Sequence, residues 1–474
     1  MMNERKTVFV TGATGFLGRA LVLRLLGSGH RVFAASRDCA TATSRLGPDV
    51  TVVPWGDEGA TELSAALGES DAVVHLGGEP IAGRWSRTKK ERISASRRDG
   101  TRRLVRLMGL APRVPSVLVS AGAIGWYGDR SEPVTEDSAP GSGFLAEVCS
   151  AWENEATRAT EHGARVAILR LGVVLGREGG ALASLLPIAR LGLSGRLGSG
   201  EQAMSWIHLH DAVELLLAAV TNPAYQGPFN AVAGHVPQRD FARSVAGAVG
   251  RGFGLPAPAV LVRLGLGEAA DMLLGGAPVE STRLDRVGFS FRYPTLAAAL
   301  AQVVDPSREP DVGPSSAHPP EIPKVPRFLL EQHTRIEASL DETFDFFSKA
   351  HNLALLTPTW TDFRVIADPN LKTEEGTRIS YRLKLGPFPI RWRTLIARWE
   401  PGRRFVDTQE RGPYALWWHE HEFVERDGGV DMTDRVHYTP PLGPLGRLAN
   451  RWVVAPTLKR IFAWRAEAIG LRFG

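Results

Sequence analysis

The chain has 474 residues, 43% of them apolar and 23% charged, which is a globular composition and excludes a wholly disordered or collagen-like protein. This length exceeds what one hydrophobic core usually organises, so we expect two or three domains. The formal net charge is +5, and the basic residues form no run that would follow a phosphate backbone, so we expect no nucleic-acid partner.

Cysteine content and hydropathy bear on the cellular compartment. Cys39 and Cys149 are the only cysteines, which is too few for a disulfide framework. No apolar run approaches the roughly 20 residues of a membrane-spanning helix, and the first residues lead into a strand without the apolar stretch of a signal peptide. We therefore expect a cytoplasmic protein with no membrane span.

Up to residue 305, short β-branched runs alternate with helical stretches. This alternation predicts an α/β domain with a doubly wound parallel sheet, covered by helices on both faces. From about residue 172 the alternation loosens, which predicts a small substrate lobe that ends with a C-terminal part at about 250–305. The predicted strands are 7–11, 31–36, 72–76, 116–120 and 165–171, and the predicted helices are 15–28, 86–110 and 144–162.

The segment VFVTGATGFLGRAL joins the first strand to the first helix. Within it, Gly12 permits a tight turn, Gly15 lets the backbone approach a pyrophosphate, and Gly18 allows close packing of helix on strand. The free N–H groups and the positive dipole of the helix N-terminus would hold the phosphates. The strand–turn–helix context makes this a nucleotide-binding motif of the Rossmann type. The same turn presents further expected contacts at Thr11, Thr14, Phe16 and Leu17.

The cofactor is selected at the end of the second strand, where NAD-binding proteins carry an acidic residue. This chain has Arg37 there, and a guanidinium can pair with the 2′-phosphate of NADP and stack on adenine. We therefore expect NADP, while the neighbouring Asp38 leaves NAD open. Further cofactor contacts are expected from Asp57 at the adenine edge, from Leu76, Gly77 and Gly78 after the fourth strand, and from Ser120 at the nicotinamide end.

These motifs resemble the extended branch of the short-chain dehydrogenase/reductase superfamily, and residues 7–305 are similar to an epimerase-like subfamily of it. The resemblance rests on TGATGFLGR, VVHLGGEPIAGRW, SRRDGTRRLV, VLVSAGAIGWYGD, GFLAEVCSAWE and MSWIHLHDAVELL. The stretch LGEAADMLLGGAPVESTRLDRVGFSFRYPTLAAAL resembles the small C-terminal region of that subfamily. The resemblance implies a nicotinamide dinucleotide cofactor and an oxidoreductase or epimerase activity on a small molecule.

The chain departs from the superfamily at the catalytic motif. Active members carry Tyr-x-x-x-Lys, in which the lysine lowers the tyrosine pKa for proton transfer. At that spacing this chain has Cys149 and Glu153, and Arg97 stands near the place of the usual asparagine. The standard proton relay is therefore absent. Two interpretations stay open: an enzyme in which Ser120 or Tyr127 serves the substrate, and a non-catalytic sensor that binds NADP(H).

Residues 306–323 contain six prolines, which predicts an extended linker that neither pairs in a sheet nor continues a helix. We expect one domain before it, at 1–305, and a second after it, at 324–474. In the second part, strand-like segments with alternating aromatic and charged residues precede a long final helix. The predicted strands are 327–337, 360–366, 377–385, 391–400, 403–409, 415–426 and 430–438, and the predicted helices are 341–356 and about 445–471.

Residues 327–474 resemble the START-like polyketide cyclase and lipid-transport superfamily, also called SRPBCC. The resemblance rests on SLDETFDFFSKAHNLALLTPTW, IRWRTLIARWEPGRRFVDTQERGPYALWWHEHEF and DRVHYTPPLGPLG. It implies an α+β helix-grip fold with an apolar cavity, and hence an apolar ligand. His419, His421 and His437 could together hold a metal, but polar pairing within the sheet is the simpler interpretation, and we expect no metal.

Overall fold

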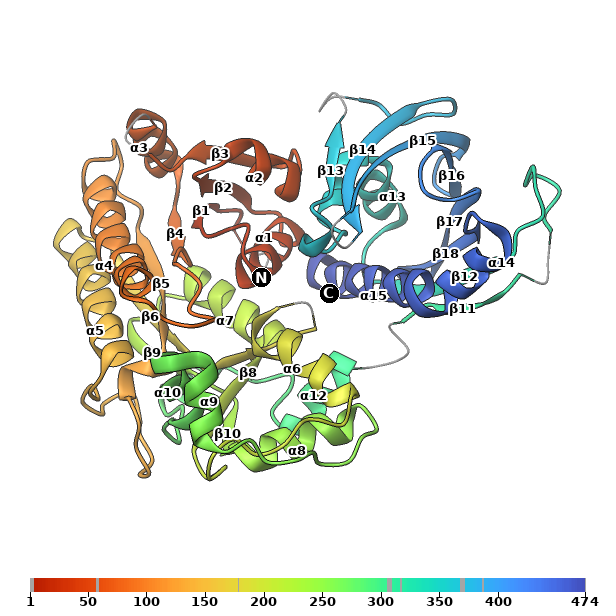
Figure 1. Cartoon of the computed structure of the whole chain (residues 1–474). Helices are drawn as coiled ribbons and strands as arrows, with labels where there is room; N and C mark the ends of the chain where they lie inside the picture. The colour runs from red at the N-terminus through yellow and green to blue at the C-terminus, as the bar shows by residue number, and fades with distance from the viewer. Residues whose placement is uncertain are drawn as a thin grey trace. The chain divides into compact units, whose positions relative to one another are not determined.

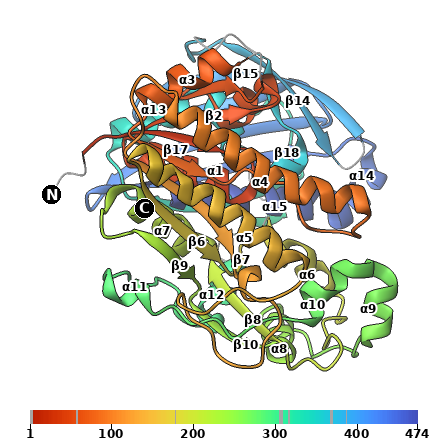
Figure 2. The ribbon, with the colours of Figure 1, turned by 90° about the vertical axis from the view of Figure 1, so that its left-hand side faces the viewer.

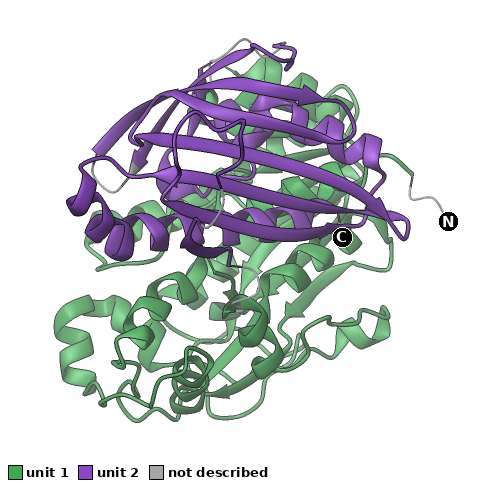
Figure 3. Cartoon of the chain, turned by 90° about the vertical axis from the view of Figure 1, so that its right-hand side faces the viewer, with its two compact units in different colours: residues 1–39, 51–304 green, residues 40–50, 305–474 purple. Residues whose placement is uncertain are grey.

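The computed structural model describes residues 4–56, 59–177, 179–304, 309–315, 318–366, 371–385 and 388–473 (Figure 1). The chain divides into two compact units, residues 1–39 with 51–304 and residues 40–50 with 305–474 (Figure 3). Among the helices of the described ranges, none combines the length and the hydropathy needed to cross a bilayer.

A seven-stranded sheet organises the first unit, in the order β3-β2-β1-β4-β5-β6-β9. Strands β2 and β1 pair in parallel, and so do the successive neighbours from β1 to β9. The order 3-2-1-4-5-6 is that of dinucleotide-binding Rossmann sheets, so the predicted doubly wound parallel sheet is confirmed. The strands are β1 (Thr7–Thr11), β2 (Arg31–Ser36), β3 (Val50–Pro54), β4 (Ala72–His75), β5 (Val117–Ala123), β6 (Arg165–Leu171) and β9 (Gly227–Ala231).

Helices pack on both faces of this sheet. Helices α4 and α5 lie side by side on one face, as Figure 2 shows, and α1 packs with α7 on the other. Because both faces are covered, Val8, Phe9 and Val10 of β1 are all fully buried instead of alternating between core and solvent. The helices are α1 (Phe16–Gly27), α3 (Ala60–Glu69), α4 (Arg87–Gly109), α5 (Phe144–Thr157) and α7 (Leu209–Thr221). Helix α2 (Cys39–Leu46) falls, except for its first residue, within the residues grouped with the second unit.

A smaller lobe with its own core completes the first unit. Its three-stranded sheet has the order β10-β8-β7, and Trp206 of β8 and Phe241 of α8 lie in its core. The lobe draws on the chain from β7 onward, which is close to residue 172, where the alternation in the sequence loosens. Its elements are β7 (Val173–Leu175), α6 (Gly180–Arg190), β8 (Ala203–His208), β10 (Gly234–Pro237), α8 (Gln238–Ala248), α9 (Ala259–Leu266), α10 (Asp271–Leu274), α11 (Arg283–Arg286) and α12 (Leu296–Val304).

An eight-stranded sheet dominates the second unit, in the order β11-β12-β18-β17-β16-β15-β14-β13, with antiparallel pairing between all neighbours. Leu458 and Phe462 of the C-terminal helix α15 share a core with Trp417, Val436 and Tyr438 of the sheet. The elements are β11 (Asp311–Pro314), β12 (Phe328–Ile336), α13 (Leu340–Ser348), β13 (Arg364–Ile366), β14 (Arg378–Leu385), β15 (Phe388–Glu400), β16 (Arg404–Arg411), β17 (Leu416–Arg426), β18 (Gly429–Thr439), α14 (Gly443–Ala449) and α15 (Ala455–Phe473).

The prediction that residues 306–323 do not pair in a sheet is wrong. Within this segment β11 pairs with β12, from Asp311 opposite Glu331 to Pro314 opposite Phe328. Strand β11 lies at the edge of the sheet, where a proline without an N–H group costs no ladder hydrogen bond.

The prediction of a strand over 360–366 is correct only for its last residues, which form β13. Asp362 adopts φ of +44° at the end of a short 3-10 turn, Thr359–Thr361, and this left-handed residue breaks the extended backbone before β13. The predicted final helix is likewise interrupted, because a π-helical turn at Asn450–Val454 separates α14 from α15.

Candidate functional site

The glycine-rich turn between β1 and α1 closes tightly on the end of β4. Gly12 has φ of +70°, and a Cβ there would lie 2.7 Å from the carbonyl carbon of Leu76. A Cβ on Gly18 would overlap the carbonyl oxygen of Gly12, and the Gly15 N–H donates to that same oxygen at 3.0 Å. The turn therefore requires glycine at two positions, in agreement with the functions expected from the sequence.

The N-terminus of α1 is open to an anion. Gly15 is its N-cap residue and is exposed, no side chain of the described residues caps it, and the first turn holds no acidic residue. The N–H groups of Phe16 and Leu17 therefore stand at a helix end that carries positive partial charge and has no competing carboxylate. Such an end fits the diphosphate of a dinucleotide.

A chain of buried hydrogen bonds holds the ends of β1 and β4 together. The Gly77 N–H donates to Thr11 Oγ1 at 3.1 Å, and Thr11 Oγ1 lies 2.7 Å from His75 Nδ1. His75 Nε2 lies 2.9 Å from Thr101 Oγ1 of α4, and the Thr101 hydroxyl donates to the Arg97 carbonyl. Burial lowers the pKa of His75 to about 4, so its imidazole is neutral.

This chain of bonds changes the expected function of one residue. Thr11 is buried and its hydroxyl is engaged by His75 and Gly77, so its side chain positions the backbone around Gly12. Sequence reasoning missed His75 and Thr101. The polar residue His75 at the end of an otherwise apolar strand was the available signal.

The residues expected to select the cofactor surround the end of β2. Arg37 is exposed and follows β2 directly, and Thr14 is half-buried in the glycine turn. Ser36 Oγ accepts the Asp38 N–H at 3.2 Å and donates to the Asp38 carbonyl at 3.0 Å, which closes a local turn around Arg37. Asp57, the expected adenine contact, lies outside the described residues.

Arg97 of α4 is a cation beside the loop that follows β4. A Cβ on Gly78 would lie 3.3 Å from the Arg97 guanidinium carbon, and Nη1 donates to the Glu79 carbonyl at 3.0 Å. Burial lowers the pKa of Arg97, and within the described residues it forms no ion pair with a carboxylate. A guanidinium in this position can bind an anionic group of a cofactor or substrate, a function that sequence reasoning did not assign to it.

The sequence predicts that Ser120 is the last residue of its strand, but in the structure the strand continues beyond it. Strand β5 continues to Ala123, and Ser120 is 1% exposed and pairs with His75 and Ile168 on either side. Its hydroxyl donates to the Ala121 carbonyl at 3.0 Å. The contact between Ser120 and the nicotinamide stays a prediction.

The positions of the missing Tyr/Lys pair hold a protonated thiol and a carboxylate that is paired with an arginine. Burial, reinforced by Glu153, raises the pKa of Cys149 to about 12, so the thiol stays protonated. Glu153 accepts two hydrogen bonds from Arg170 of β6, from Nε at 2.9 Å and from Nη2 at 2.8 Å, and both side chains are buried. Neither residue can serve as a phenolate and its activating ammonium.

The interpretation in which Tyr127 serves the substrate does not agree with its position in the structure. Tyr127 ends a short 3-10 turn that folds its ring, fully buried, into a cluster with Val134, Val232 and Val279. Its hydroxyl donates to Asn230 Oδ1 at 2.7 Å and accepts from Arg170 Nη1 at 2.8 Å. Burial also raises its pKa, so Tyr127 has a structural function and does not replace the missing tyrosine.

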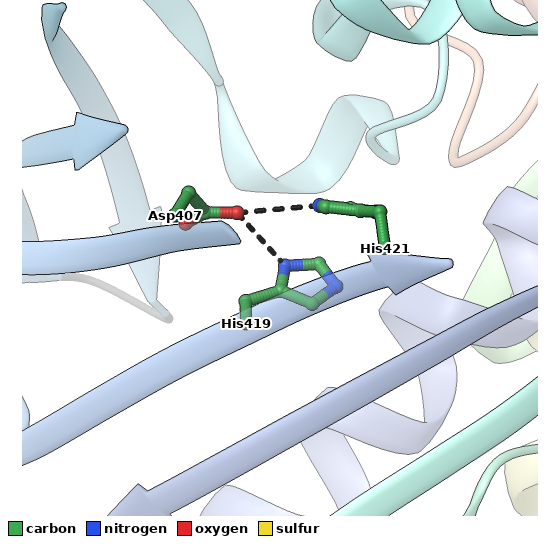
Figure 4. A group of neighbouring side chains, drawn as sticks. All are labelled: Asp407, His419 and His421. Atoms are coloured by element: carbon green, nitrogen blue, oxygen red, sulfur yellow. Dashed lines mark hydrogen bonds and ion pairs between the residues drawn. The ribbon is translucent and has the colours of Figure 1, made fainter. Parts of the chain in front are cut away.

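The second unit encloses a separate cavity of about 180 Å³ between its sheet, α13 and α15. Its wall is largely apolar and includes several aromatic side chains, among them Trp392, Trp417 and Phe462. Asp407, His419 and His421 form a polar group on this wall, with the carboxylate facing both imidazoles (Figure 4). The cavity is thus apolar with one charged, hydrogen-bonding end.

His437 does not lie with His419 and His421, so the three imidazoles considered from the sequence as a metal site do not come together. His437 pairs in register with Trp418, which alternates along β17 with the cavity-lining residues Trp417 and His419. Successive side chains of a strand point to opposite faces, so His437 lies on the other face of the sheet.

Comparisons with known proteins concern the first unit. Residues 8–232 match the NAD dependent epimerase/dehydratase family, and residues 257–303 match a domain of unknown function, DUF1731. The chain is 39% identical to the chloroplastic epimerase family protein SDR39U1 homolog of Arabidopsis thaliana, over 64% of this chain and 88% of that protein. It is 34% identical to the epimerase family protein YfhF of Bacillus subtilis, over 63% of this chain and 97% of YfhF.

A solved structure supports the same assignment. The crystal structure of human epimerase family protein SDR39U1 (isoform 2) with NADPH is 33% identical to this chain, with a TM-score of 0.57, over 63% of this chain and 99% of that one. The parallel sheet, the glycine turn and these similarities agree, and the chain belongs to the NAD dependent epimerase/dehydratase family.

Proposed function

We propose that this chain binds NADP(H) at the glycine turn of its first unit and acts as an epimerase-family oxidoreductase on a small molecule. The observation that carries the proposal is the steric one: at Gly12 and Gly18 a Cβ would fill the space that the turn needs, next to an uncapped helix N-terminus. These features fit a diphosphate held by backbone N–H groups. The human relative solved with NADPH supports the same cofactor.

NADP is preferred over NAD because of the charge at the end of β2. Arg37 is exposed there, and the Ser36–Asp38 hydrogen bonds hold the backbone turn that presents it. A guanidinium at this position attracts the 2′-phosphate, whereas NAD recognition relies on a carboxylate that accepts ribose hydroxyl protons. Asp38, next to Arg37 in the sequence, keeps NAD open as the weaker ligand.

A non-catalytic NADP(H) sensor is the second candidate, and a specific observation favours it. The positions of the proton relay hold Cys149, whose thiol stays protonated, and Glu153, whose carboxylate is paired with Arg170. Tyr127 is buried away from the cleft. Binding without turnover is therefore expected if no other group replaces the Tyr/Lys relay.

For residues 324–474 we propose a START-like helix-grip module that binds an apolar ligand. The antiparallel sheet, the long helix α15 and the aromatic cavity between them support this proposal. The polar group at His419 would orient the ligand through a hydrogen bond, while Trp392 and Trp417 cover its apolar part. Strand β11, which lies within the segment 306–323, belongs to the sheet of this module.

Two further expectations from the sequence stay as proposals: a cytoplasmic location and the absence of a nucleic-acid partner. Both rest on composition and on the dispersed basic residues.

The test is a fluorescence titration of the full chain with NADPH, followed by a search for NADPH oxidation with carbonyl compounds and sugar nucleotides. We expect saturable binding in the wild type and none in Gly15→Asp, because a carboxylate there would repel the phosphates. Gly247→Asp is the matched control, since that exposed glycine of α8 has open space around it. Saturable binding with turnover supports the oxidoreductase, and binding without turnover supports the sensor. Equal affinity in the wild type and Gly15→Asp would remove the proposed site.

A further inference from the structure

The polar group in the cavity of the second unit brings three metal-ligand side chains together from two strands. His419 and His421 alternate along β17 and face the cavity, and Asp407 of β16 lies opposite His419 in register. Asp407 Oδ2 lies 3.2 Å from His419 Nδ1 and 3.3 Å from His421 Nε2 (Figure 4). One ligand atom from each of the three residues lies within 4.8 Å of the other two.

The two distances from Asp407 Oδ2 to the imidazole nitrogens are close to the distances between ligand atoms that share one ion. Two ligand atoms bound to a tetrahedral Zn²⁺ at about 2.0–2.1 Å are roughly 3.3–3.5 Å apart. Charge-assisted N–H···O hydrogen bonds are shorter, at about 2.7–2.9 Å. The Asp407 oxygen is in long hydrogen-bond contact with His421 Nε2 at 3.3 Å, and it also stands at the distance expected for a fellow ligand of each imidazole nitrogen.

Asp434 occupies the opposite side of both imidazoles. Its Oδ1 lies 3.1 Å from His419 Nε2 and 2.7 Å from His421 Nδ1, which are the ring nitrogens that do not face Asp407. Arg465 of α15 holds the same oxygen, with Nη1 at 3.4 Å. Metal-binding histidines characteristically present their second ring nitrogen to such a carboxylate, which fixes the tautomer and the ring orientation.

The cluster is buried and incompletely satisfied. His421 is 5% exposed and Asp434 is 1% exposed. Within the described residues His421 Nδ1, Asp434 Oδ2 and Arg465 Nε make no hydrogen bond, and the 2.7 Å approach of His421 Nδ1 to Asp434 lacks hydrogen-bond geometry. Asp434 is buried and Asp407 is half-buried, and a cation between the imidazoles would pair with these carboxylates.

We propose that Asp407, His419 and His421 bind one divalent transition-metal ion, with Zn²⁺ as the reference ion. Two imidazoles and one carboxylate suit Zn²⁺, Fe²⁺ or Co²⁺ better than Mg²⁺ or Ca²⁺, which prefer oxygen ligands. Three protein ligands leave a coordination position open. That position faces the aromatic cavity, so the ion would bind an oxygen or nitrogen atom of the ligand proposed for this module.

The test uses the full chain after chelation and dialysis, titrated with Co²⁺ and followed by visible absorption. We expect one equivalent of Co²⁺ to produce the intense d–d band of four- or five-coordinate cobalt, and Zn²⁺ to abolish it. Asp407→Asn, His419→Ala and His421→Ala should remove the band. Asp434→Asn should weaken binding about 10–100-fold, as loss of an orienting partner does. His333→Ala is the control, since this exposed histidine of β12 should leave the band unchanged.

The proposal depends first on the wild type, so it does not require that every variant folds. Absence of a one-equivalent Co²⁺ band in the wild type would overturn it and leave a cluster of hydrogen-bonded histidines and carboxylates. Retention of the band in a correctly folded His421→Gln would also overturn it, with folding checked by circular dichroism. Because the readout does not involve NADPH, failure here is distinguishable from failure of the nucleotide site.

Discussion

Arg170 of β6 and Glu153 of α5 form a buried, bidentate ion pair, with hydrogen bonds of 2.9 and 2.8 Å, at the place where the superfamily keeps its relay lysine. The pair links the sheet to the helix that would otherwise carry the catalytic motif. Arg170 also donates to Tyr127, so the whole region forms a closed structural network. In this chain, the region that performs proton transfer in active relatives stabilises the fold.

The first prediction concerns this ion pair. Glu153→Ala leaves the Arg170 guanidinium buried without a carboxylate, and we expect a loss of about 3–5 kcal/mol in the stability of the first unit. The measurement is thermal unfolding followed by circular dichroism. The double variant Glu153→Leu/Arg170→Met should recover much of the loss, because a buried pair can be replaced by apolar side chains. A loss as small as that of a surface pair would contradict the account.

The second prediction concerns the shape of the glycine turn. Gly18→Ala should abolish NADPH binding, because its Cβ would overlap the Gly12 carbonyl and push α1 away from β1. Gly247→Ala is the matched control: this helical glycine has open space around it, and alanine there should leave binding unchanged and raise stability by about 0.5–1 kcal/mol. Calorimetric titration measures the NADPH affinity of both variants, and thermal unfolding measures the stability of Gly247→Ala. Undiminished affinity in Gly18→Ala would show that the turn is not the binding site.

The third prediction concerns cofactor choice. Arg37→Ala should weaken NADPH binding by about 1–3 kcal/mol, the value of a charged hydrogen bond, with a much smaller effect on NADH. Arg31→Ala provides the control, since that exposed arginine stands at the other end of β2 and pairs with Glu69. Equal losses for the two nucleotides in a fluorescence titration would refute the assignment of Arg37 to the 2′-phosphate.

The fourth prediction concerns acid sensitivity through His75. Burial lowers its pKa from the ordinary 6.5 to about 4, so the unfolded chain binds a proton at a pH where the folded chain does not. This contribution to stability is complete above pH 6.5 and is lost as the pH falls toward 4. His75→Asn should therefore show a shallower decline of the melting temperature over this range. An unchanged slope would mean that His75 is not buried in its neutral form.

The strands of the first unit could be predicted closely, while their side-chain contacts could not. β1, β2 and β6 have the predicted bounds, since strands buried on both faces appear as continuous apolar runs. Tyr127 was misplaced because its burial depends on Asn230, 103 residues away in sequence. His75 and Thr101 were missed for the same reason, because only the folded chain brings the end of β4 against α4.

The polar group of the second unit shows a similar limit. Alternation along β17 placed His419 and His421 on one face, as the structure has it. The third member, Asp407, comes from the neighbouring strand, and its identification requires the register of β16 against β17. The place of His437 on the opposite face could not be predicted, because the register of β18 was equally unavailable from the sequence.

The most direct measurement is a crystal structure of the full chain soaked with NADPH. The account predicts the diphosphate against the backbone of Gly12, Gly15 and Gly18, with the 2′-phosphate on Arg37. A nucleotide bound elsewhere, or a turn closed by the chain itself in the soaked crystal, would contradict it.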